Sequence, residues 1–296
     1  MATYKGIQGY SVQTLASDPS PAASVEGQLW FNSTSSTYKI AVAGAGAWAS
    51  APAINTARSS LAGAGASQTS AVIFGGTSPT GDMSETEEYN GSSWAEQDDL
   101  NTGRRQPGGT GIQTAALCVG GAAASVTGAT ETYDGSSWTT SPASLNTARR
   151  GCSGQGSTTA ALCAAGTTTG YVDNSEEFDG STWTNGNTLN EARQGGFAAF
   201  GTQTAAILSG GQSNTPSPGT YAASTESYDG TTWTAVNSLN TGRTDCAGFG
   251  IQTAGLATGG STGSLTGATE KWDGTSWTEV ADLATARQAL SSASNA

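Results

Sequence analysis

The chain of 296 residues contains no histidine and only 11 lysines and arginines, and it has no apolar run long enough to span a membrane. The missing histidine removes the side chain that most often serves as a general base or metal ligand. The basic residues form no patch and the net charge is −12, which disfavours nucleic-acid binding. No Gly-x-Ser-x-Gly or phosphate-loop motif is present. We therefore expect no enzymatic activity, no cofactor or metal, no nucleic-acid partner and no membrane insertion.

Large aliphatic residues are also scarce, since Leu, Ile, Val and Phe together number only 36. So low a content is typical of disordered chains, yet charged residues make up only 11 %, which excludes a self-repelling polyelectrolyte. Small residues dominate instead, and they suit closely stacked sheets. The first residues contain no apolar segment of a secretory signal, so we expect synthesis and folding in a cytoplasm.

What the sequence has in abundance is repetition. The phrase Asn-Thr-(Ala/Gly)-Arg, with small variations, begins at residues 55, 101, 146, 190 and 240, and a sixth copy runs from Ala284 to Arg287. A period of 44 to 50 residues indicates a repeat architecture. Each full repeat divides into four short strands separated by turns.

The clearest turn in each repeat places Asp-Gly or Asn-Gly between two aromatic residues, as in Tyr133-Asp-Gly-Ser-Ser-Trp138. Asp-Gly is a preferred hairpin pair, and aromatic residues that face each other across strands stabilise the hairpin. The second strand ends in a di-glycine or Ala-Gly, as in Gly120-Gly121. Four antiparallel strands per period are the unit of a β-propeller blade.

The di-glycine, the Glu-x-Tyr-Asp, the later Trp and the Thr-x-Arg of each repeat resemble the kelch family of propellers. The likeness covers about 240 residues. The Tyr-to-Trp turn is shorter than in standard kelch blades, so the chain is kelch-like. The repeat pattern and the resemblance together predict an all-β β-propeller with four-stranded antiparallel blades, and five full repeats plus the two chain ends predict six blades. The activity of kelch-type copper oxidases requires histidine ligands and is not implied here.

We predict one propeller over residues 23–296, preceded by an arm at 1–22. The sixth blade is expected to close the ring, with the strands 28–31, 37–42 and 47–50 from the N-terminal side and the strand near 284–290 from the C-terminus, because a repeat array needs its ends covered. The blades predicted from the period are 55–100, 101–145, 146–189, 190–239 and 240–283, with the closing blade formed by 23–54 and 284–296.

Each repeat contributes one arginine just before its innermost strand, which is expected to lie at one mouth of the central channel. One hypothesis is that six guanidinium groups bind an anion or a carboxylated glycan. The other, which we favour, is that each arginine pairs with a glutamate of the same period and fastens adjacent blades. The arginines are Arg58, Arg104, Arg149, Arg193, Arg243 and Arg287, and the glutamates are Glu87, Glu131, Glu176, Glu226 and Glu270.

The connections between the second and third strands vary most and lie on the same face as the arginines. Recognition usually resides in variable loops on a rigid scaffold, although such loops also simply tolerate insertions. Tyr171 in the third repeat and Tyr221 in the fourth are the candidate binding residues. The acidic segment 82–99 matches no calcium-loop spacing and is expected to be a solvated face.

The four cysteines occupy two pairs of equivalent repeat positions, Cys118 with Cys163 and Cys152 with Cys246. Equivalent positions lie in different sheets and should be too far apart to bridge. Cys152 and Cys163 share one repeat and could face each other across a hairpin. Four buried thiols are the favoured interpretation, and a Cys152–Cys163 disulfide is the alternative.

The N-terminal residues carry the clue to function. The segment from Glu26 to Asn32, followed by Tyr38, Lys39 and Trp48, resembles a hairpin found in bacteriophage tail-fibre and other virion structural proteins, and the opening Met1 to Leu15 resembles such proteins from marine phages. The resemblance implies a virion binding or decoration module made in the host cytoplasm. Its partners would be other virion proteins through the arm and a host-surface glycan or protein through the loops. The alternatives are a cytoplasmic kelch-like adaptor for a protein partner and, third, an atypical carbohydrate-active enzyme.

Overall fold

The computed structural model of the chain describes residues 13–15, 29–32, 37–40, 48–214 and 220–290, and within these ranges it contains β-strands and no helices. The predicted all-β class is confirmed. No helix in the described ranges has the length and apolarity needed to cross a membrane. The chain divides into two compact units, Met1–Ala47 and Trp48–Ala296.

Within residues 48–290 the predicted repeat becomes five four-stranded antiparallel sheets, numbered 1 to 5 in chain order. Each sheet pairs its strands in sequence order, so every repeat folds as an antiparallel meander. The strands are β4 (Ala62–Ser67), β5 (Ser70–Phe74), β8 (Thr86–Tyr89) and β9 (Trp94–Gln97) in sheet 1; β10 (Gly108–Ile112), β11 (Ala115–Val119), β12 (Ala129–Tyr133) and β13 (Trp138–Ser144) in sheet 2; β14 (Ser153–Gly156), β15 (Ala161–Ala164), β16 (Ser175–Phe178) and β17 (Trp183–Asn185) in sheet 3; β19 (Ala198–Thr202), β20 (Ala205–Ser209), β23 (Thr225–Tyr228) and β24 (Trp233–Val236) in sheet 4; and β25 (Ala247–Ile251), β26 (Ala254–Thr258), β27 (Thr269–Trp272) and β28 (Trp277–Val280) in sheet 5.

Two of the connections between second and third strands contain short strands of their own. The connection of sheet 1 folds into a small hairpin, and that of sheet 4 pairs with the segment that enters the sheet. These strands are β6 (Thr77–Ser78), β7 (Gly81–Asp82), β18 (Arg193–Gln194), β21 (Gln212–Ser213) and β22 (Thr220–Tyr221).

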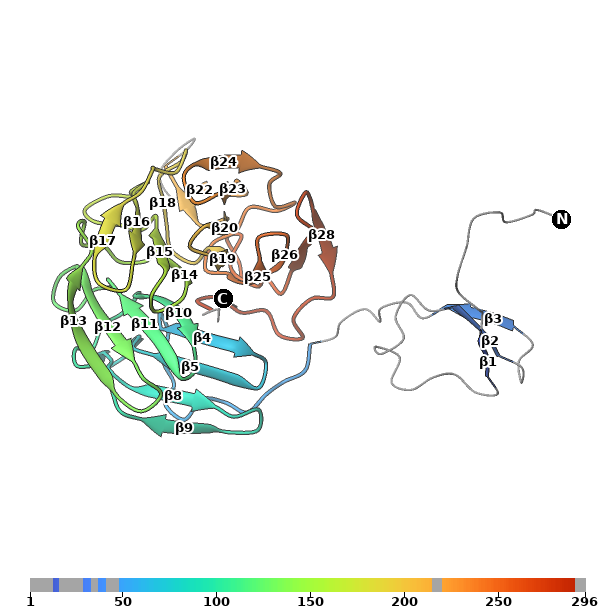
Figure 1. The fold of residues 1–296 in the computed structure, drawn as a ribbon, viewed down its shortest axis with the longest axis horizontal. Helices are drawn as coiled ribbons and strands as arrows, with labels where there is room; N and C mark the ends of the chain where they lie inside the picture. Colours follow the sequence, from blue (N-terminus) through green and yellow to red (C-terminus); the bar gives the residue numbers. More distant parts are fainter. Residues whose placement is uncertain (1–12, 16–28, 33–36, 41–47, 215–219, 291–296) are drawn as a thin grey trace. The chain divides into compact units, whose positions relative to one another are not determined.

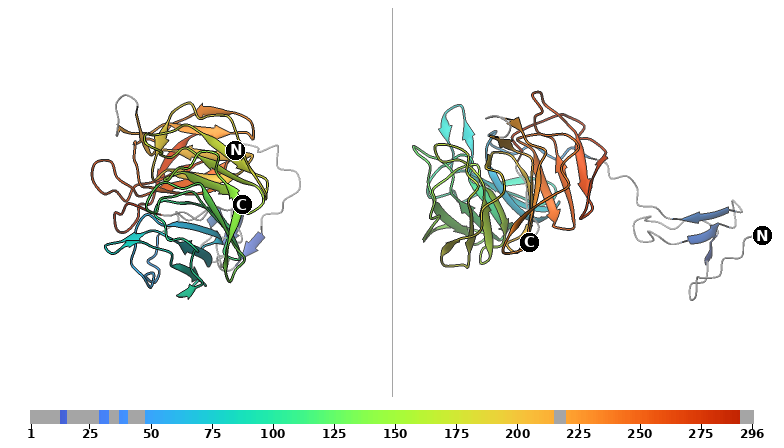
Figure 2. Two further views of the ribbon diagram at one scale, coloured as in Figure 1. Left: turned by 90° about the vertical axis from the view of Figure 1, so that its left-hand side faces the viewer. Right: turned by 90° about the horizontal axis from the view of Figure 1, so that it is seen from above.

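The five sheets are arranged around a common centre, toward which the first strand of each sheet lies (Figure 1), and Figure 2 shows them from two further sides. Neighbouring first strands contact each other in the order β4, β10, β14, β19 and β25. The strands approach so closely that a Cβ on Gly154 of β14 would lie 2.7 Å from the carbonyl oxygen of Gly109 in β10. The abundance of small residues is therefore a requirement of this convergence.

The aromatic turn forms in all five repeats, with its two aromatic residues directly opposite each other. The Tyr133 and Trp138 rings lie 5.0 Å apart. The turn is longer than a two-residue hairpin, and the Asp134 carboxylate closes it by accepting from the Ser136 and Ser137 amides at 2.9 and 2.8 Å. These hydrogen bonds, with that from the Ser137 amide foremost, lower the pKa of Asp134 to about 2. The aspartate thus acts through its side chain, while Gly135 supplies the positive φ of 93°.

The apolar core consists of layers between adjacent sheets, and each layer includes the tryptophan of the later sheet. Trp138 of sheet 2 packs edge-on against Phe74 of sheet 1, with the ring centroids 4.7 Å apart. Its indole nitrogen donates to Thr86 Oγ1, also in sheet 1, at 2.9 Å. The tryptophan that completes a hairpin in its own sheet therefore also joins that sheet to the one before it.

The first unit contains a three-stranded sheet of β1 (Gln13–Leu15), β2 (Leu29–Asn32) and β3 (Thr37–Ile40), in which β1 is parallel and β3 antiparallel to β2. The strands predicted at 28–31 and 37–42 correspond to β2 and β3, and β1 falls within the predicted arm 1–22. The strands predicted at 47–50 and 284–290 differ, because residues 48–50 and 284–290 form no strand. Extended backbone becomes a strand only when a neighbouring segment pairs with it. About half of the predicted closing blade, including 291–296, lies outside the described residues.

Candidate functional site

The asparagine and the arginine of the Asn-Thr-x-Arg phrase both bind the glutamate of the same repeat. In sheet 2, the Asn101 amide nitrogen donates to Glu131 Oε2 at 2.8 Å, and its Nδ2 donates to the Trp138 carbonyl at 3.1 Å. The Arg104 Nη2 donates to Glu131 Oε1, while its Nη1 donates to the Ala129 carbonyl at 3.1 Å. The phrase recurs because its asparagine and its arginine both satisfy one buried carboxylate.

Five of the six predicted arginines are buried in this way. The guanidinium-bearing side chains are at most 1 % exposed and their glutamates at most 2 %. Nitrogen–oxygen distances are 2.6 Å for two of the pairs and 2.8 Å for a third. Burial lowers the pKa of Arg193, although the negative charges of Glu226 and Glu191 act to raise it. The pairs are Arg58–Glu87, Arg104–Glu131, Arg149–Glu176, Arg193–Glu226 and Arg243–Glu270.

The backbone carbonyls of four of the buried arginines, Arg104, Arg149, Arg193 and Arg243, each accept from a glycine amide that follows the second strand of the preceding sheet. The Arg104 carbonyl accepts from the Gly76 amide at 2.8 Å, and the Arg104 amide donates to the Met83 carbonyl at 2.9 Å, both in sheet 1. Its side chain meanwhile binds Glu131 of sheet 2. Arg104, Arg149, Arg193 and Arg243 therefore make the contacts expected of a fastening between sheets, whereas Arg58 shares with them the buried glutamate contact. Their charges are already met by carboxylates, so they offer no open anion site.

Arg287, the sixth arginine, differs in that its side chain is exposed. Its Nε donates to the Thr285 carbonyl at 3.4 Å, and no carboxylate among the described residues pairs with it. Its backbone carbonyl nevertheless accepts from the Gly260 amide, which follows the second strand of sheet 5, at 2.8 Å. The carbonyls of Arg104, Arg149, Arg193 and Arg243 accept from the equivalent glycines in the same way. The six predicted arginines therefore do not form one equivalent set.

The two predicted tyrosines lie on connections that come together across three sheets. Tyr171 of sheet 3 donates its hydroxyl to Gln212 Oε1 of sheet 4 at 3.1 Å, and Gln212 is directly paired with Tyr221. Tyr221 is 39 % exposed, and its ring lies 3.7 Å from the position a Cβ on Gly263 of sheet 5 would take. Leu265, in the same connection as Gly263, is 55 % exposed. We call Tyr171, Gln212, Tyr221, Gly263 and Leu265 the loop surface.

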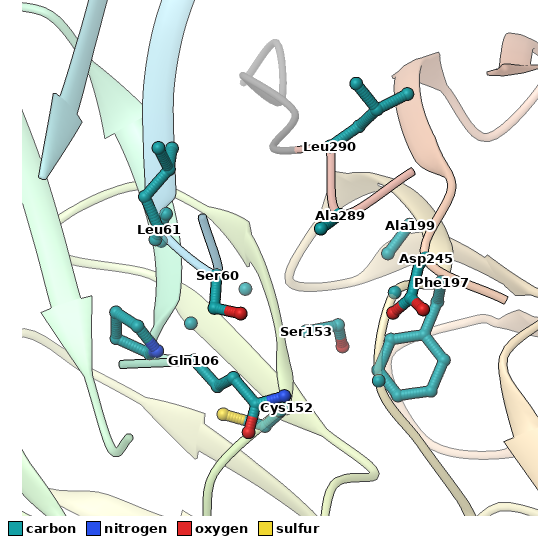
Figure 3. A pocket seen from close by; sticks show the side chains of 18 of the residues that line it. Ser60, Leu61, Gln106, Cys152, Ser153, Phe197, Ala199, Asp245, Ala289 and Leu290 are labelled. Carbon is teal, nitrogen blue, oxygen red and sulfur yellow. The ribbon is translucent and has the colours of Figure 1, made fainter. Parts of the chain in front are cut away.

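At the centre of the five sheets lies a cavity of about 120 Å³ that was not predicted from the sequence. Residues of all five repeats and of the sixth copy line it, among them the polar side chains of Ser60, Gln106, Ser153 and Asp245 (Figure 3). Burial raises the pKa of the Asp245 carboxyl above its ordinary value. Backbone hydrogen bonds join the copies around the cavity. The backbone amide of Gln106 donates to the Ser60 carbonyl at 2.7 Å, and the backbone amide of Gly151 donates to the backbone carbonyl of Gln106 at 2.8 Å.

One cavity-lining residue from each copy of the phrase has the same unusual backbone conformation. The residue two places after each arginine has a left-handed backbone in all six copies, which non-glycine residues rarely adopt. The glycines found there in the third and fourth repeats were the available sequence signal. The six φ angles are 56° at Ser60, 52° at Gln106, 59° at Gly151, 61° at Gly195, 56° at Asp245 and 55° at Ala289.

All four cysteines are buried free thiols, as favoured, and no Cys152–Cys163 bridge is present. Within the described ranges, no group of three histidine, cysteine, aspartate or glutamate side chains is placed to hold a metal ion. The acidic segment 82–99 is only partly a solvated face, because Glu87 is buried against Arg58 and Glu88 accepts from the Tyr133 hydroxyl at 3.0 Å. A scan against models of known protein families finds no match, and a search of curated proteins finds none either.

Proposed function

We propose that the chain is a six-bladed, kelch-like β-propeller that serves as a non-enzymatic binding module on a bacteriophage virion and recognises a neutral host-surface glycan through the loop surface. Each four-stranded sheet is one blade, and residues 23–54 with 284–296 supply the sixth. The observation that carries the binding role is the continuity of the loop surface over three blades.

The closing blade is supported by Trp48, which contacts sheet 5 as the tryptophan of a sixth repeat should. Trp277 of sheet 5 lies edge-on to Phe200 of sheet 4, with centroids 6.2 Å apart and planes at 73°. Trp48 meets Phe249 of sheet 5 at 6.0 Å and 82°. Phe200 and Phe249 are the third residues of the equivalent strands β19 and β25. The sixth copy of the phrase supports closure from the C-terminal side. The Arg287 carbonyl accepts from Gly260 as earlier arginine carbonyls accept from their glycines, and Ala289 has the left-handed backbone of the equivalent residues.

A truncation series tests the closing blade. Removing residues 1–47 should expose the faces of the first and fifth blades and lower the free energy of unfolding by at least about 2 kcal/mol. Removing residues 1–22 alone, the predicted arm, should leave it nearly unchanged. Urea denaturation of both truncations and of the full chain gives the comparison. Equal stability of the two truncations would show that residues 23–47 fold independently of the ring.

A neutral glycan suits the loop surface better than a charged one. The exposed ring of Tyr221 can pack on the apolar face of a sugar, and the neighbouring Gln212 amide can exchange hydrogen bonds with hydroxyl groups. The net charge of −12 repels acidic glycans, and the five buried arginines are already paired. A neutral glycan therefore takes the place of the carboxylated glycan expected for an open ring of six arginines.

Glycan binding is tested with Tyr221→Ala on an array of neutral and acidic glycans. We expect binding to a neutral glycan to weaken about tenfold or more, since a stacked ring contributes roughly 1 kcal/mol or more. Ile251→Ala is the matched control, because Ile251 is 50 % exposed but lies at the turn between first and second strands, at the opposite end of its sheet. A preference for acidic glycans, or equal losses in both variants, would contradict the proposal.

The virion location is supported by the N-terminal hairpin. β2 and β3 pair antiparallel with Phe31 opposite Tyr38, which agrees with the hairpin that the phage resemblance implies. Mass spectrometry of purified virions tests the location. The chain should be present at a reproducible copy number relative to the major capsid protein. Its absence from virions but presence in infected-cell lysate would favour the cytoplasmic adaptor instead.

A further inference from the structure

Sheet 3 contains two cysteines that meet across its first two strands. Cys152 immediately precedes β14, and Cys163 lies on β15 directly opposite Gly154. Since Cys152 is two residues before Gly154, its side chain lies on the same face of the sheet as Cys163. Both side chains belong to one buried apolar cluster with Leu117, so they pack together between sheets 2 and 3.

The repeat provides two natural comparisons for this pair. Cys118 takes the place of Cys163 in sheet 2, and Cys246 takes the place of Cys152 in sheet 5, but each is the only cysteine of its sheet. Burial raises the pKa of both lone thiols to about 12. In sheet 3 the hydrogen bond from the Cys163 thiol, assisted by the Arg149 guanidinium, holds the pKa of Cys152 below its ordinary value despite burial. Burial and the neighbouring Cys152 raise the pKa of Cys163.

Cys152 is also among the residues that line the central cavity (Figure 3). A cavity of about 120 Å³ is several times larger than a water molecule needs, so it can admit a small oxidant. Cys163 is completely buried behind it, at 0 % exposure. One thiol can therefore meet a small molecule, while the other can be reached only from its partner.

We propose that Cys152 and Cys163 form a reversible oxidation site in which a hydroperoxide converts the dithiol into a disulfide. The Cys152 thiolate attacks one oxygen of hydrogen peroxide, the O–O bond breaks, and the other oxygen leaves as hydroxide. Cys152 is then a sulfenic acid. The Cys163 sulfur attacks the Cys152 sulfur, the S–O bond breaks, and the departing hydroxide takes the Cys163 proton to form water. Two electrons pass from the dithiol to the peroxide.

The test treats the full chain with hydrogen peroxide and counts thiols after denaturation. We expect the four free thiols to fall to two, with the loss of two hydrogen atoms from the intact mass and a Cys152–Cys163 peptide in the digest. A thiol reductant should restore all four. The oxidation of Cys152 should be at least about tenfold faster than that of Cys118 or Cys246, since thiolate is the reactive species.

Single serine variants separate the steps. Cys118→Ser and Cys246→Ser should still form the bridge, while Cys163→Ser should stop at a sulfenic acid on Cys152 that a dimedone probe labels. Cys152→Ser should leave Cys163 reduced. Four persisting thiols in the wild-type chain, or equal oxidation of all four cysteines, would overturn the proposal. The wild-type peptide map decides the question even if a serine variant fails to fold.

Discussion

Replacing Glu131 by glutamine is expected to lower the free energy of unfolding by about 3–5 kcal/mol, because it leaves the Arg104 charge buried without a counter-charge. Both side chains are only 1 % exposed, so water cannot take the place of the carboxylate. The change also removes the charged acceptor of the Asn101 amide and side chain. Glutamine keeps the size of the residue, and the loss is therefore electrostatic rather than a packing defect. Urea denaturation gives the value from the midpoint and slope.

The control is Asp82→Asn, which breaks the ion pair with Arg105, the residue immediately after Arg104. This pair is close, at 2.7 Å, but the two side chains are 38 % and 20 % exposed. Surface pairs contribute about 0–1 kcal/mol, so this variant should remain near the wild type. If the two variants lost equal stability, the buried pair could not be the fastening between sheets that its contacts indicate.

Replacing Trp183 by alanine is expected to cost about 3–5 kcal/mol, the usual range for removing a large buried aromatic side chain. Trp183 is 6 % exposed and stacks on Phe178 of its own sheet with the centroids 5.0 Å apart. Its indole nitrogen donates to Thr130 Oγ1 of sheet 2 at 2.9 Å. The substitution thus leaves a cavity and removes a bond between two sheets. Urea denaturation, with tryptophan-independent detection by circular dichroism, measures the loss.

Trp183→Phe separates the two contributions. Phenylalanine retains an aromatic ring beside Phe178 but has no N–H for Thr130, so it should lose the hydrogen bond, worth about 1 kcal/mol, together with part of the packing. A smaller loss than for alanine is therefore expected. An alanine variant within about 1 kcal/mol of the wild type would mean that adjacent sheets do not depend on this tryptophan.

The sequence predicted the repeats because the local rules act within each repeat. The aromatic turn is formed by residues at most five positions apart, so one short segment of the sequence contains all the residues that form it. The Arg–Glu pairs were also predictable, since both partners recur with the same period. The turn mechanism was refined by the structure, because the Asp134 carboxylate rather than a positive φ at aspartate closes the loop.

Features formed jointly by residues of several repeats could not be predicted from the sequence. The central cavity is formed by single residues contributed from each copy, and no stretch of the sequence contains it. The strands expected at 47–50 and 284–290 had the right composition, but a strand also needs a paired neighbour. Arg287 also differs from the other five arginines, because no carboxylate among the described residues pairs with it.

Arg104 has its backbone in one sheet and its side chain in the next. The stabilising contacts therefore continue across the boundary between two sequence repeats. A single sheet supplies the glutamate for one such arginine and the backbone partner for the next. It cannot complete either set of contacts without its neighbours. Adding or losing part of a period would separate an arginine from its glutamate, whereas a whole period of 44 to 50 residues would restore every pair. Changes in length should therefore be tolerated in whole repeats or in the connections between second and third strands, and cooperativity should pass from each sheet to its neighbour.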